Sequence, residues 1–430
     1  MKDRILVVSW FYPPVNTAEA ICAYKQLKNS SFEYDIITQT QNFSWSYGNF
    51  TSLPELENVN VISIEAGSCR DFISPAIKYF KENIDNYDVV ITRSMPPESH
   101  EIGLEIKRLK PSIFWIASLN DPIANNPYTL RKIKYPNKYS LSTKAGGCFS
   151  LKRVISVKRF FESAIFQLKR IKLRLLLAKE VKLQRNILEK CDYLVCNNEY
   201  QLRRFEESFN GKGLSEKTLI VPHSYDPDFY YSAEQKRENE KIIFTYFGHA
   251  DQIRTPFQLF CAIKELRDDY PDLASRVCFN FYGNIDMCDV NYISEQNLRD
   301  MIFIHGGLEY KESLKTMQSS DWLIHLDANL YDVVPENIFF ASKLTDYMGS
   351  GAQIFGITML NGIGADILRE ANAVCSSHSV QDIRNYLYMI IFKGFTKKLD
   401  ENYISQYKAS LCSKKIDERI SNALTENNCS

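Results

Sequence analysis

Residues 242–256 read IIFTYFGHADQIRTP, in which six β-branched or aromatic residues end at Gly248 and Arg254 stands just before a segment of helical spacing. A short apolar run that ends at a glycine predicts a buried strand, and the segment after it predicts a helix. Gly248 allows a ligand to approach the backbone closely. Arg254 is unfavourable beside the positive end of a helix dipole unless an anion binds there. The stretch therefore predicts a strand–loop–helix unit with an anion site at the carboxyl end of the strand.

The same alternation of apolar runs and helical spacing extends along the chain. Predicted strands lie at residues 4–10, 34–38, 59–64, 89–92, 113–118, 193–197, 219–221, 242–247, 277–282, 301–305, 322–327 and 353–357. Strands that alternate with helices predict parallel sheets covered by helices. These strands are too many for one ordinary sheet, and 430 residues are too many for one hydrophobic core. The sequence therefore predicts an α/β protein with two Rossmann-like domains.

The best domain boundary follows Val221 and Pro222, because residues 232–241 are charged, contain few large apolar side chains and precede a new strand. We predict a first domain at 1–222, a hinge at 223–240 and a second domain at 241–396. Residues 397–430 have few strand signals, and we predict that they form a helix that crosses back over the domain interface.

The composition excludes several classes of protein. Lys and Arg number 52, and Asp and Glu number 52, so nothing global indicates a nucleic-acid partner. The eleven cysteines include no Cys-x-x-Cys pair, which favours reduced thiols over a disulfide or zinc framework. No apolar run approaches the roughly 20 residues of a membrane span. We expect a cytoplasmic protein that is not an integral membrane protein.

Residues 151–190 differ from the rest of the chain, because eleven Lys and Arg stand against two Glu between positions 152 and 185. An apolar stripe of helical spacing runs through the segment, formed by Val154, Val157, Phe161, Ile165, Leu168, Ile171 and Leu175. A basic amphipathic helix of this kind is typical of proteins that rest on an anionic membrane surface. The alternative is an amphipathic helix packed on the first domain.

The first predicted strand runs into residues 9–18, which read SWFYPPVNTA, and a helical segment follows. Loops at the carboxyl ends of parallel strands are where such sheets bind ligands. We therefore predict that the loop with Pro14, Asn16 and Thr17 binds a phosphate or the acceptor through backbone N–H groups. The alternative is a plain strand-to-helix turn.

Two further strand ends of the first domain carry candidate residues. Asp121 follows the strand at 113–118 and precedes Pro122, and its carboxylate could accept a hydrogen bond from an acceptor hydroxyl or from a sugar. An Asx-turn or a helix N-cap is the alternative for this Asp-Pro pair. His100 is a second candidate for the same cleft, with the first turn of a helix as its alternative position.

Residues 342–353 read SKLTDYMGSGAQ and give the strongest local signal in the chain. Lys343 and Asp346 stand three positions apart, so both lie on one face of a helix. Lys343 can then reach the phosphates of a nucleotide while Asp346 accepts its ribose hydroxyls. The alternative is a surface salt bridge worth tenths of a kcal/mol. The Gly-x-Gly that ends at Gly351, with the strand after it, favours the nucleotide site.

These elements occur in a fixed order: the Pro-Pro loop, the Asp121-Pro122 strand end, the interdomain segment at 220–228, the Gly248–Arg254 loop and the Ser-Lys-x-x-Asp-Tyr helix. In that order they resemble the family 4 glycosyltransferases of bacterial surface-polysaccharide synthesis. The resemblance implies the GT-B fold, in which two Rossmann-like domains face each other across a cleft. It also implies an NDP-sugar in the second domain and an acceptor in the first. Transfer would proceed with retention of configuration, without a metal or cofactor.

The resemblance also implies roles for individual residues. Gly248, Arg254 and Lys343 would bind the donor diphosphate, and the two cations would stabilise it as it departs. The loop with Gly307, Leu308 and Tyr310 would hold the base. Together with the basic segment, the resemblance favours a lipid-linked acceptor at the inner face of the cytoplasmic membrane.

The chain departs from the family pattern at several positions. Residues 16–18 replace the glycines of the first loop, and Asp346 replaces a glutamate. A second family glutamate, eight positions earlier, corresponds to Ile338 in this chain, which offers no carboxylate to the transferred sugar. Asp226 and Asp228 form an Asp-x-Asp of the kind that metal-dependent transferases of another fold use, but we predict no metal here.

Two other functions fit the same residues. An NDP-sugar 2-epimerase would bind the same donor without an acceptor, and it would require carboxylates and a histidine around the sugar. A catalytically degenerate partner protein would bind nucleotide or lipid without turnover. The departures from the family pattern are the main support for this last alternative.

Overall fold

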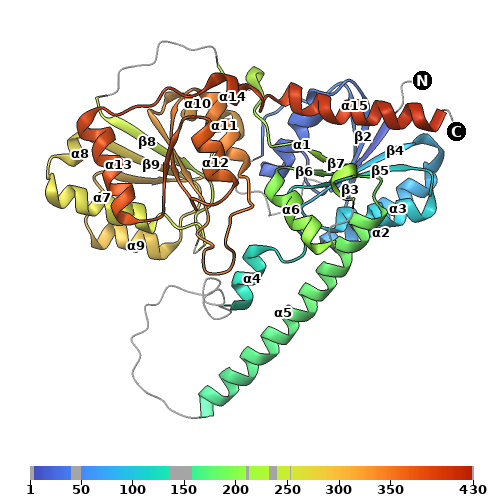
Figure 1. Cartoon of the computed structure of the whole chain (residues 1–430), viewed down its shortest axis with the longest axis horizontal. Helices are drawn as coiled ribbons and strands as arrows, with labels where there is room; N and C mark the ends of the chain where they lie inside the picture. The colour runs from blue at the N-terminus through green and yellow to red at the C-terminus, as the bar shows by residue number, and fades with distance from the viewer. Residues whose placement is uncertain are drawn as a thin grey trace.

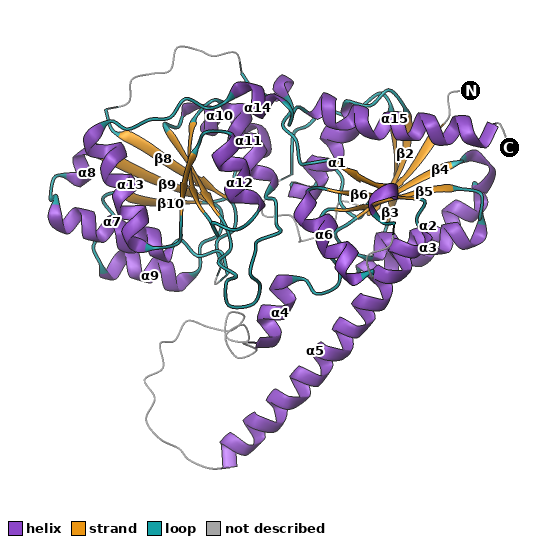
Figure 2. Cartoon of the chain, in the orientation of Figure 1, coloured by secondary structure: helices purple, strands orange, loops and turns teal. Residues whose placement is uncertain are grey.

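The computed structural model describes residues 4–39, 50–134, 157–209, 213–231, 240–251 and 253–428. These residues form two α/β domains that lie side by side (Figure 1). Each domain holds one parallel sheet with helices on the outside (Figure 2). The predicted fold class of two Rossmann-like domains is confirmed.

The first domain is built on a seven-stranded sheet with the order β3-β2-β1-β4-β5-β6-β7. Its strands are β1 (Arg4–Val8), β2 (Glu33–Gln39), β3 (Val59–Ile64), β4 (Val89–Arg93), β5 (Phe114–Leu119), β6 (Tyr193–Cys196) and β7 (Thr218–Ile220). Its helices are α1 (Ala18–Lys28), α2 (Cys69–Glu82), α3 (Glu98–Leu109), α4 (Pro127–Lys134), α5 (Val157–Lys190) and α6 (Glu199–Ser208). Leu6 and Val8 point into the core on one face of the sheet, while Ile5 and Val7 point into the core on the other. A strand covered on both faces is largely apolar, which is why apolar runs predicted the central strands of this sheet.

The second domain has a six-stranded sheet with the order β10-β9-β8-β11-β12-β13. Its strands are β8 (Ile242–Phe247), β9 (Val277–Tyr282), β10 (Ile302–His305), β11 (Trp322–Leu326), β12 (Gln353–Ile357) and β13 (Val374–Ser376). Its helices are α7 (Phe257–Asp269), α8 (Leu273–Arg276), α9 (Met287–Glu295), α10 (Tyr310–Ser319), α11 (Ser342–Ser350), α12 (Ile363–Glu370) and α13 (Val380–Lys393). All predicted strands are present within two residues of the predicted ends. The three-residue strand β13 was not predicted.

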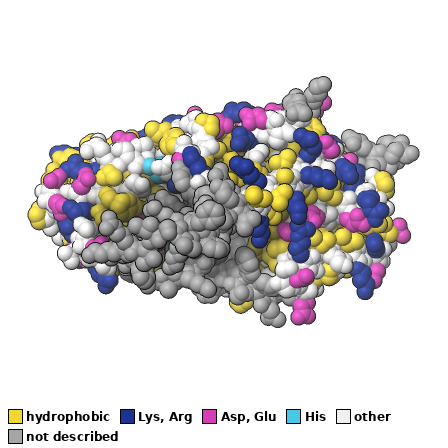
Figure 3. All heavy atoms as spheres, turned by 90° about the horizontal axis from the view of Figure 1, so that it is seen from below, with side chains coloured by type: hydrophobic (Ala, Val, Ile, Leu, Met, Phe, Trp, Pro, Cys, Tyr) yellow, Lys and Arg dark blue, Asp and Glu magenta, His cyan; other side chains and the backbone are white. Residues whose placement is uncertain are grey.

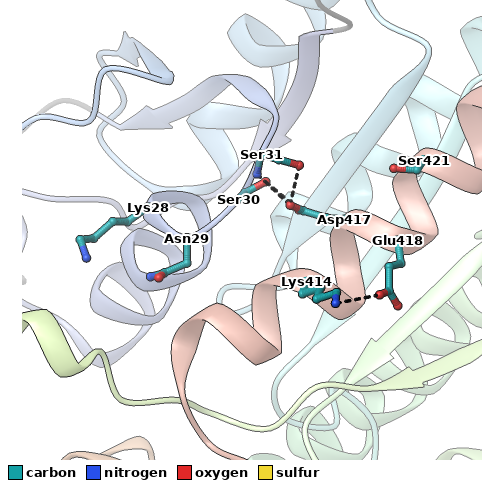
Figure 4. A pocket seen from close by; sticks show the side chains of 8 residues that line it. All are labelled: Lys28, Asn29, Ser30, Ser31, Lys414, Asp417, Glu418 and Ser421. Atoms are coloured by element: carbon teal, nitrogen blue, oxygen red, sulfur yellow. Dashed lines mark hydrogen bonds and ion pairs between the residues drawn. The ribbon is translucent and has the colours of Figure 1, made fainter.

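The chain ends in α14 (Glu401–Ser405) and α15 (Ala409–Asn428), and α15 lies on the first domain. Ile416 and Ile420 of α15 pack into the same core as β1 and β4. Asp417 accepts hydrogen bonds from Ser30 Oγ at 2.6 Å and from the backbone N of Ser31 at 2.8 Å (Figure 4). These residues line an open groove of about 550 Å³ between α15 and the turn after α1. The C-terminal segment therefore ties the second domain to the first.

Helix α5 extends away from the first domain, as Figure 1 shows. Its C-terminal end is anchored in the domain core through Ile187 and Leu188. Ile171 and Leu175 of the predicted stripe are 53% and 61% exposed, so this part of the stripe does not pack on the domain. Residues 151–156, with Val154, and the side chains of 157–170 lie outside the described part of the chain. No helix of the described residues is long and apolar enough to span a membrane.

Candidate active site at the domain interface

The loop after β8 brings backbone and charge close together. Gly248 has a φ of +118°, and a Cβ added there would lie 2.3 Å from Nζ of Lys343. Its backbone N donates to the carbonyl of Tyr282 at 2.8 Å. A residue with a side chain would be strained in this conformation and would displace the lysine. Gly248 therefore leaves the room that the Lys343 ammonium occupies.

Lys343 lies in the first turn of α11 and is half-buried. Its Nζ donates to the carbonyl oxygen of Phe247 at 2.5 Å and lies 4.7 Å from the centre of the Tyr246 ring. Desolvation, reinforced by the charge of Arg254, holds the pKa of Lys343 well below its usual range, and Asp327 opposes this shift. A half-buried ammonium with only a carbonyl and a ring as described partners is suited to bind an anion.

Arg254 lies in the same loop and is contacted by the first domain. Its backbone N donates to Asp251, and its Nη2 donates to the hydroxyl of Tyr128 in α4 at 3.3 Å. The Nε atom is buried and has no hydrogen-bond partner among the residues that the structure describes. The Tyr128 ring stacks on Phe339 of the second domain with a centroid distance of 4.6 Å. Tyr128 therefore closes the interface over Arg254.

Two carboxylates, one from each domain, accompany these cations. Asp121 follows β5 and Asp327 follows β11. Burial raises the pKa of each to about 6, and the charge of Arg254 opposes the shift in both. Asp327 accepts hydrogen bonds from Asn337 Nδ2 at 2.6 Å and from the backbone N of Ala328 at 2.8 Å. The structure thus brings three predicted catalytic residues, Arg254, Lys343 and Asp121, into one electrostatic cluster.

The predicted ribose ligand Asp346 lies where the two domains meet. Its Oδ1 accepts hydrogen bonds from Nζ of Lys25 at 2.6 Å and from the hydroxyl of Tyr310 at 3.0 Å. Tyr310, predicted for the base pocket, is only 8% exposed. Its hydroxyl donates its hydrogen bond to Asp346, so this group is not free to bind a base.

The predicted acceptor loop touches the predicted base loop. Asn16 Nδ2 donates to the carbonyl oxygen of Leu308 at 3.2 Å, next to Gly307. Thr17 is the N-cap of α1 and accepts from the backbone N of Ala20. The carbonyl of Pro14 accepts from the backbone N of Thr51 at 2.8 Å. These loops therefore close one edge of the interface.

Two predicted site residues have structural positions instead. His100 is fully buried in the first turn of α3, with Nδ1 2.7 Å from Thr92 Oγ1, and burial lowers its pKa to about 3. The structure therefore places it in the core, in the helix position given above as its alternative. Gly351 ends α11 with a φ of +76°, and no heavy atom lies within 4 Å of the position of its Cβ. Its backbone conformation accounts for the glycine.

The remaining motif residues are also accounted for. Ile338, at the position of the family glutamate, is buried in an apolar cluster with Ile253 and Leu330. Asp226 and Asp228 are ion-paired with Lys28 at 2.8 and 2.6 Å. Within the described ranges, no group of three or more His, Cys, Asp or Glu could hold a metal ion.

Sequence reasoning missed Lys25, Tyr128 and Asp327. Lys25 carried a signal, because it falls on the buried face of α1 beside Ile21. A charge on an apolar helix face indicates a buried partner. Asp327 was visible only as the end of a predicted strand. Nothing in the local sequence marks Tyr128.

No family model matches the chain, and no curated protein matches it. Solved structures do match. Sucrose-phosphate synthase from Thermosynechococcus elongatus is 11% identical with a TM-score of 0.67, and the match covers 99% of this chain and 100% of that one. WaaG, described as a glycosyltransferase involved in lipopolysaccharide biosynthesis, is 11% identical with a TM-score of 0.56 over 96% and 94% of the two chains. The chain has the GT-B fold.

The GT-B fold is also that of a Listeria monocytogenes protein named as a UDP-N-acetylglucosamine 2-epimerase. That protein is 10% identical with a TM-score of 0.55, over 99% of this chain and 98% of the other. At such low identities the matches establish the fold, and the function has to be argued from the site.

Proposed function

We propose that the chain is a glycosyltransferase that moves a sugar from an NDP-sugar to a glycan acceptor. The observation that carries the proposal is the placement of Arg254 and Lys343 together at the strand ends of the second domain. Asp121 of the first domain belongs to the same electrostatic cluster. Neither cation has an ion pair to a carboxylate of the described residues. A diphosphate would supply the missing negative charge.

The residues have distinct tasks in this reaction. Arg254 and Lys343 stabilise the charge that grows on the departing diphosphate, and Gly248 lets the phosphate approach the backbone. Asp121 accepts a hydrogen bond from the acceptor hydroxyl. The contact of Tyr128 with Arg254 and Phe339 excludes water and aligns the two substrates. By the family resemblance we propose retention of configuration, with the donor phosphate accepting the acceptor proton and without a metal or cofactor.

We propose that the acceptor is lipid-linked and that α5 rests on an anionic membrane surface. Ile171, Leu175 and Leu176 are exposed on α5, beside the exposed Lys172 and Arg174. Figure 3 looks from the side toward which α5 extends, and Lys and Arg lie among hydrophobic side chains on the described part of that face. The described role of WaaG in lipopolysaccharide biosynthesis supports a surface-glycan acceptor.

The donor site is tested by the shift in melting temperature with UDP-, GDP-, dTDP- and CMP-sugars. A ligand at 100 times its Kd adds roughly 2.7 kcal/mol of stability. We expect one nucleotide class to stabilise the wild type but neither Arg254→Ala nor Lys343→Ala. The matched controls are Arg108→Ala and Lys78→Ala, whose side chains are 67% and 76% exposed. Absence of a shift with every nucleotide would favour the degenerate partner.

The membrane proposal is tested by flotation with vesicles of phosphatidylglycerol and of phosphatidylcholine. Each basic residue near an anionic surface contributes about 1 kcal/mol. We expect binding to the anionic vesicles alone, and we expect Lys172→Glu with Arg174→Glu to weaken it. Lys414→Glu, an exposed lysine on α15, is the matched control. Equal binding of all variants would contradict a role for α5.

A 2-epimerase is the second candidate, and one observation favours it. Oδ2 of Asp327 and Nε2 of His325 lie 3.2 and 3.6 Å from the position of a Cβ on Gly364, so a carboxylate and a histidine share one side of the site. The two functions separate when the stabilising NDP-sugar is incubated without acceptor. An epimerised NDP-sugar would identify the epimerase, whereas transfer only in the presence of acceptor would identify the transferase.

A further inference from the structure

The ammonium group of Lys25 is buried between the two domains, so other groups of the protein must compensate its positive charge. Lys25 lies on α1 and is 1% exposed. A charge removed from water is strongly unfavourable unless it is paired and hydrogen-bonded. The contacts of Lys25 therefore show which groups compensate this charge.

Lys25 joins three parts of the molecule. Its Nζ donates to the carbonyl of Ser224, in the segment between the domains, at 2.8 Å. It donates to Oδ1 of Asp346 on α11 at 2.6 Å, and it lies 5.3 Å from the ring centre of Tyr310 on α10. A residue of the first domain therefore fixes two residues predicted for the donor site in the second.

The described hydrogen bonds of the Asp346 carboxylate fall on one oxygen. Lys25 and the Tyr310 hydroxyl both donate to Oδ1. A carboxylate offers about four acceptor positions on two oxygens. Holding Oδ1 in this way fixes the plane of the carboxylate and the direction of Oδ2.

We propose that Lys25 is a positioning residue for nucleoside recognition, which orients Asp346 so that its Oδ2 accepts a hydrogen bond from a ribose hydroxyl of the donor. The inference rests on the proposed transferase function. Because Lys25 belongs to the first domain, ribose recognition depends on the closed arrangement of the two domains. The diphosphate contacts of Arg254 and Lys343 do not depend on Lys25.

The test compares ligands that differ by one hydroxyl. Wild type, Lys25→Met and Asp346→Asn are titrated with UDP, or with GDP if the panel selects guanosine, and with its 2′-deoxy and 3′-deoxy forms. Inorganic pyrophosphate is titrated in parallel. Removal of the ribose hydroxyl that bonds to Asp346 removes one hydrogen bond to a charged group. At least one deoxy form should therefore bind wild type about tenfold or more weakly than the parent nucleotide does.

We define the deoxy penalty as the Kd of the deoxy form divided by the Kd of the parent nucleotide. We expect this ratio to fall to about one in Lys25→Met and in Asp346→Asn, while pyrophosphate affinity changes little. Each penalty is a ratio within one variant, so general destabilisation does not produce the effect. Lys28→Met is the matched control, because Lys28 is on the same helix but pairs with Asp226 and Asp228. Its penalty should equal that of wild type.

If Lys25→Met does not fold, Tyr310→Phe serves the same test, because it removes one of the two donors to Oδ1 and should reduce the penalty partly. The role of Lys25 would be overturned if the folded variants kept the deoxy penalty of wild type. It would also be overturned if wild type bound pyrophosphate but showed no deoxy penalty. Failure of wild type to bind both pyrophosphate and nucleotide would instead overturn the proposed function.

Discussion

The carboxyl ends of the two sheets each carry an arginine, buried in the first domain and half-buried in the second, and the two arginines have different partners. In the first domain, Arg93 ends β4 and is 3% exposed. Its Nε donates to Glu19 at 2.8 Å and its Nη1 donates to Gln26. In the second domain, Arg254 has a tyrosine hydroxyl as its described side-chain partner, and its Nε has none.

The difference in partners indicates that Arg93 stabilises the fold, whereas Arg254 is available to bind a ligand. A buried ion pair that is fully hydrogen-bonded needs nothing further, and breaking it is strongly unfavourable. A cation without a carboxylate partner carries a desolvation penalty that a ligand can relieve. The second-domain site, with Arg254 and Lys343, is therefore the one built for an anion. Mutations should separate the two sites by stability and by binding.

The largest effect should be on the stability of the empty protein. Arg93→Ala leaves Glu19 without its cation and should lower the free energy of unfolding by about 3–5 kcal/mol. Arg254→Ala breaks no ion pair and should change it by about 1 kcal/mol or less. Urea denaturation of both variants measures the difference. Equal destabilisation would show that Arg254 is also structural.

Donor binding should show the reverse order. Loss of one partner from a desolvated charge pair costs about 2–5 kcal/mol, so Arg254→Ala should raise the Kd for the NDP-sugar by at least about 30-fold. Arg254→Lys, which keeps the charge without the planar fork, should bind with intermediate affinity. Calorimetric titration measures both. Unchanged NDP-sugar affinity in Arg254→Ala would show that Arg254 is not part of the donor site.

Two glycine substitutions sharpen the role of Lys343. Gly248→Ala introduces a Cβ 2.3 Å from Lys343 Nζ, whereas Gly351→Ala meets no heavy atom within 4 Å, and both positions have positive φ. Each should destabilise the fold by about 1–2 kcal/mol through backbone strain. Only Gly248→Ala should also weaken NDP-sugar binding. Isothermal titration of both variants checks this, and equal affinities would contradict a donor contact of Lys343.

The smallest expected effect is that of pH. Burial raises the pKa of Asp121 and Asp327 to about 6, so both become negative as the pH rises through that value. The negative charge on these two carboxylates disfavours a diphosphate, so NDP-sugar affinity should fall by roughly tenfold between pH 5.5 and 7.5.

Asp121→Asn and Asp327→Asn should flatten that dependence, because an amide does not ionise. Titration of each variant at both pH values provides the comparison. Affinity that rises with pH in wild type would mean that these carboxylates do not act on the donor.

The fold could be read from the sequence because burial on both faces leaves a largely apolar run in the central parallel strands, such as β1 and β8. The strand β13 was not predicted, because Val374–Ser376 is followed by polar residues, whereas β7, also of three residues, overlaps the apolar run at 219–221. Arg254 and Lys343 were found because a glycine and a cation at a strand or helix end form a local signal. The partner of Asp346 was not found, because Lys25 lies 321 positions away and its pairing depends on how the domains meet. For the same reason, Tyr128 over Arg254 could not be foreseen.

A crystal structure with the stabilising nucleoside diphosphate bound would show directly whether Arg254 and Lys343 hold the donor. Phosphate oxygens should lie within about 2.7–3.2 Å of the Arg254 guanidinium and the Lys343 ammonium, beside Gly248. A diphosphate bound elsewhere, with the Arg254 side chain still hydrogen-bonded to Tyr128 and the Lys343 ammonium still hydrogen-bonded to Phe247, would contradict the proposed donor site.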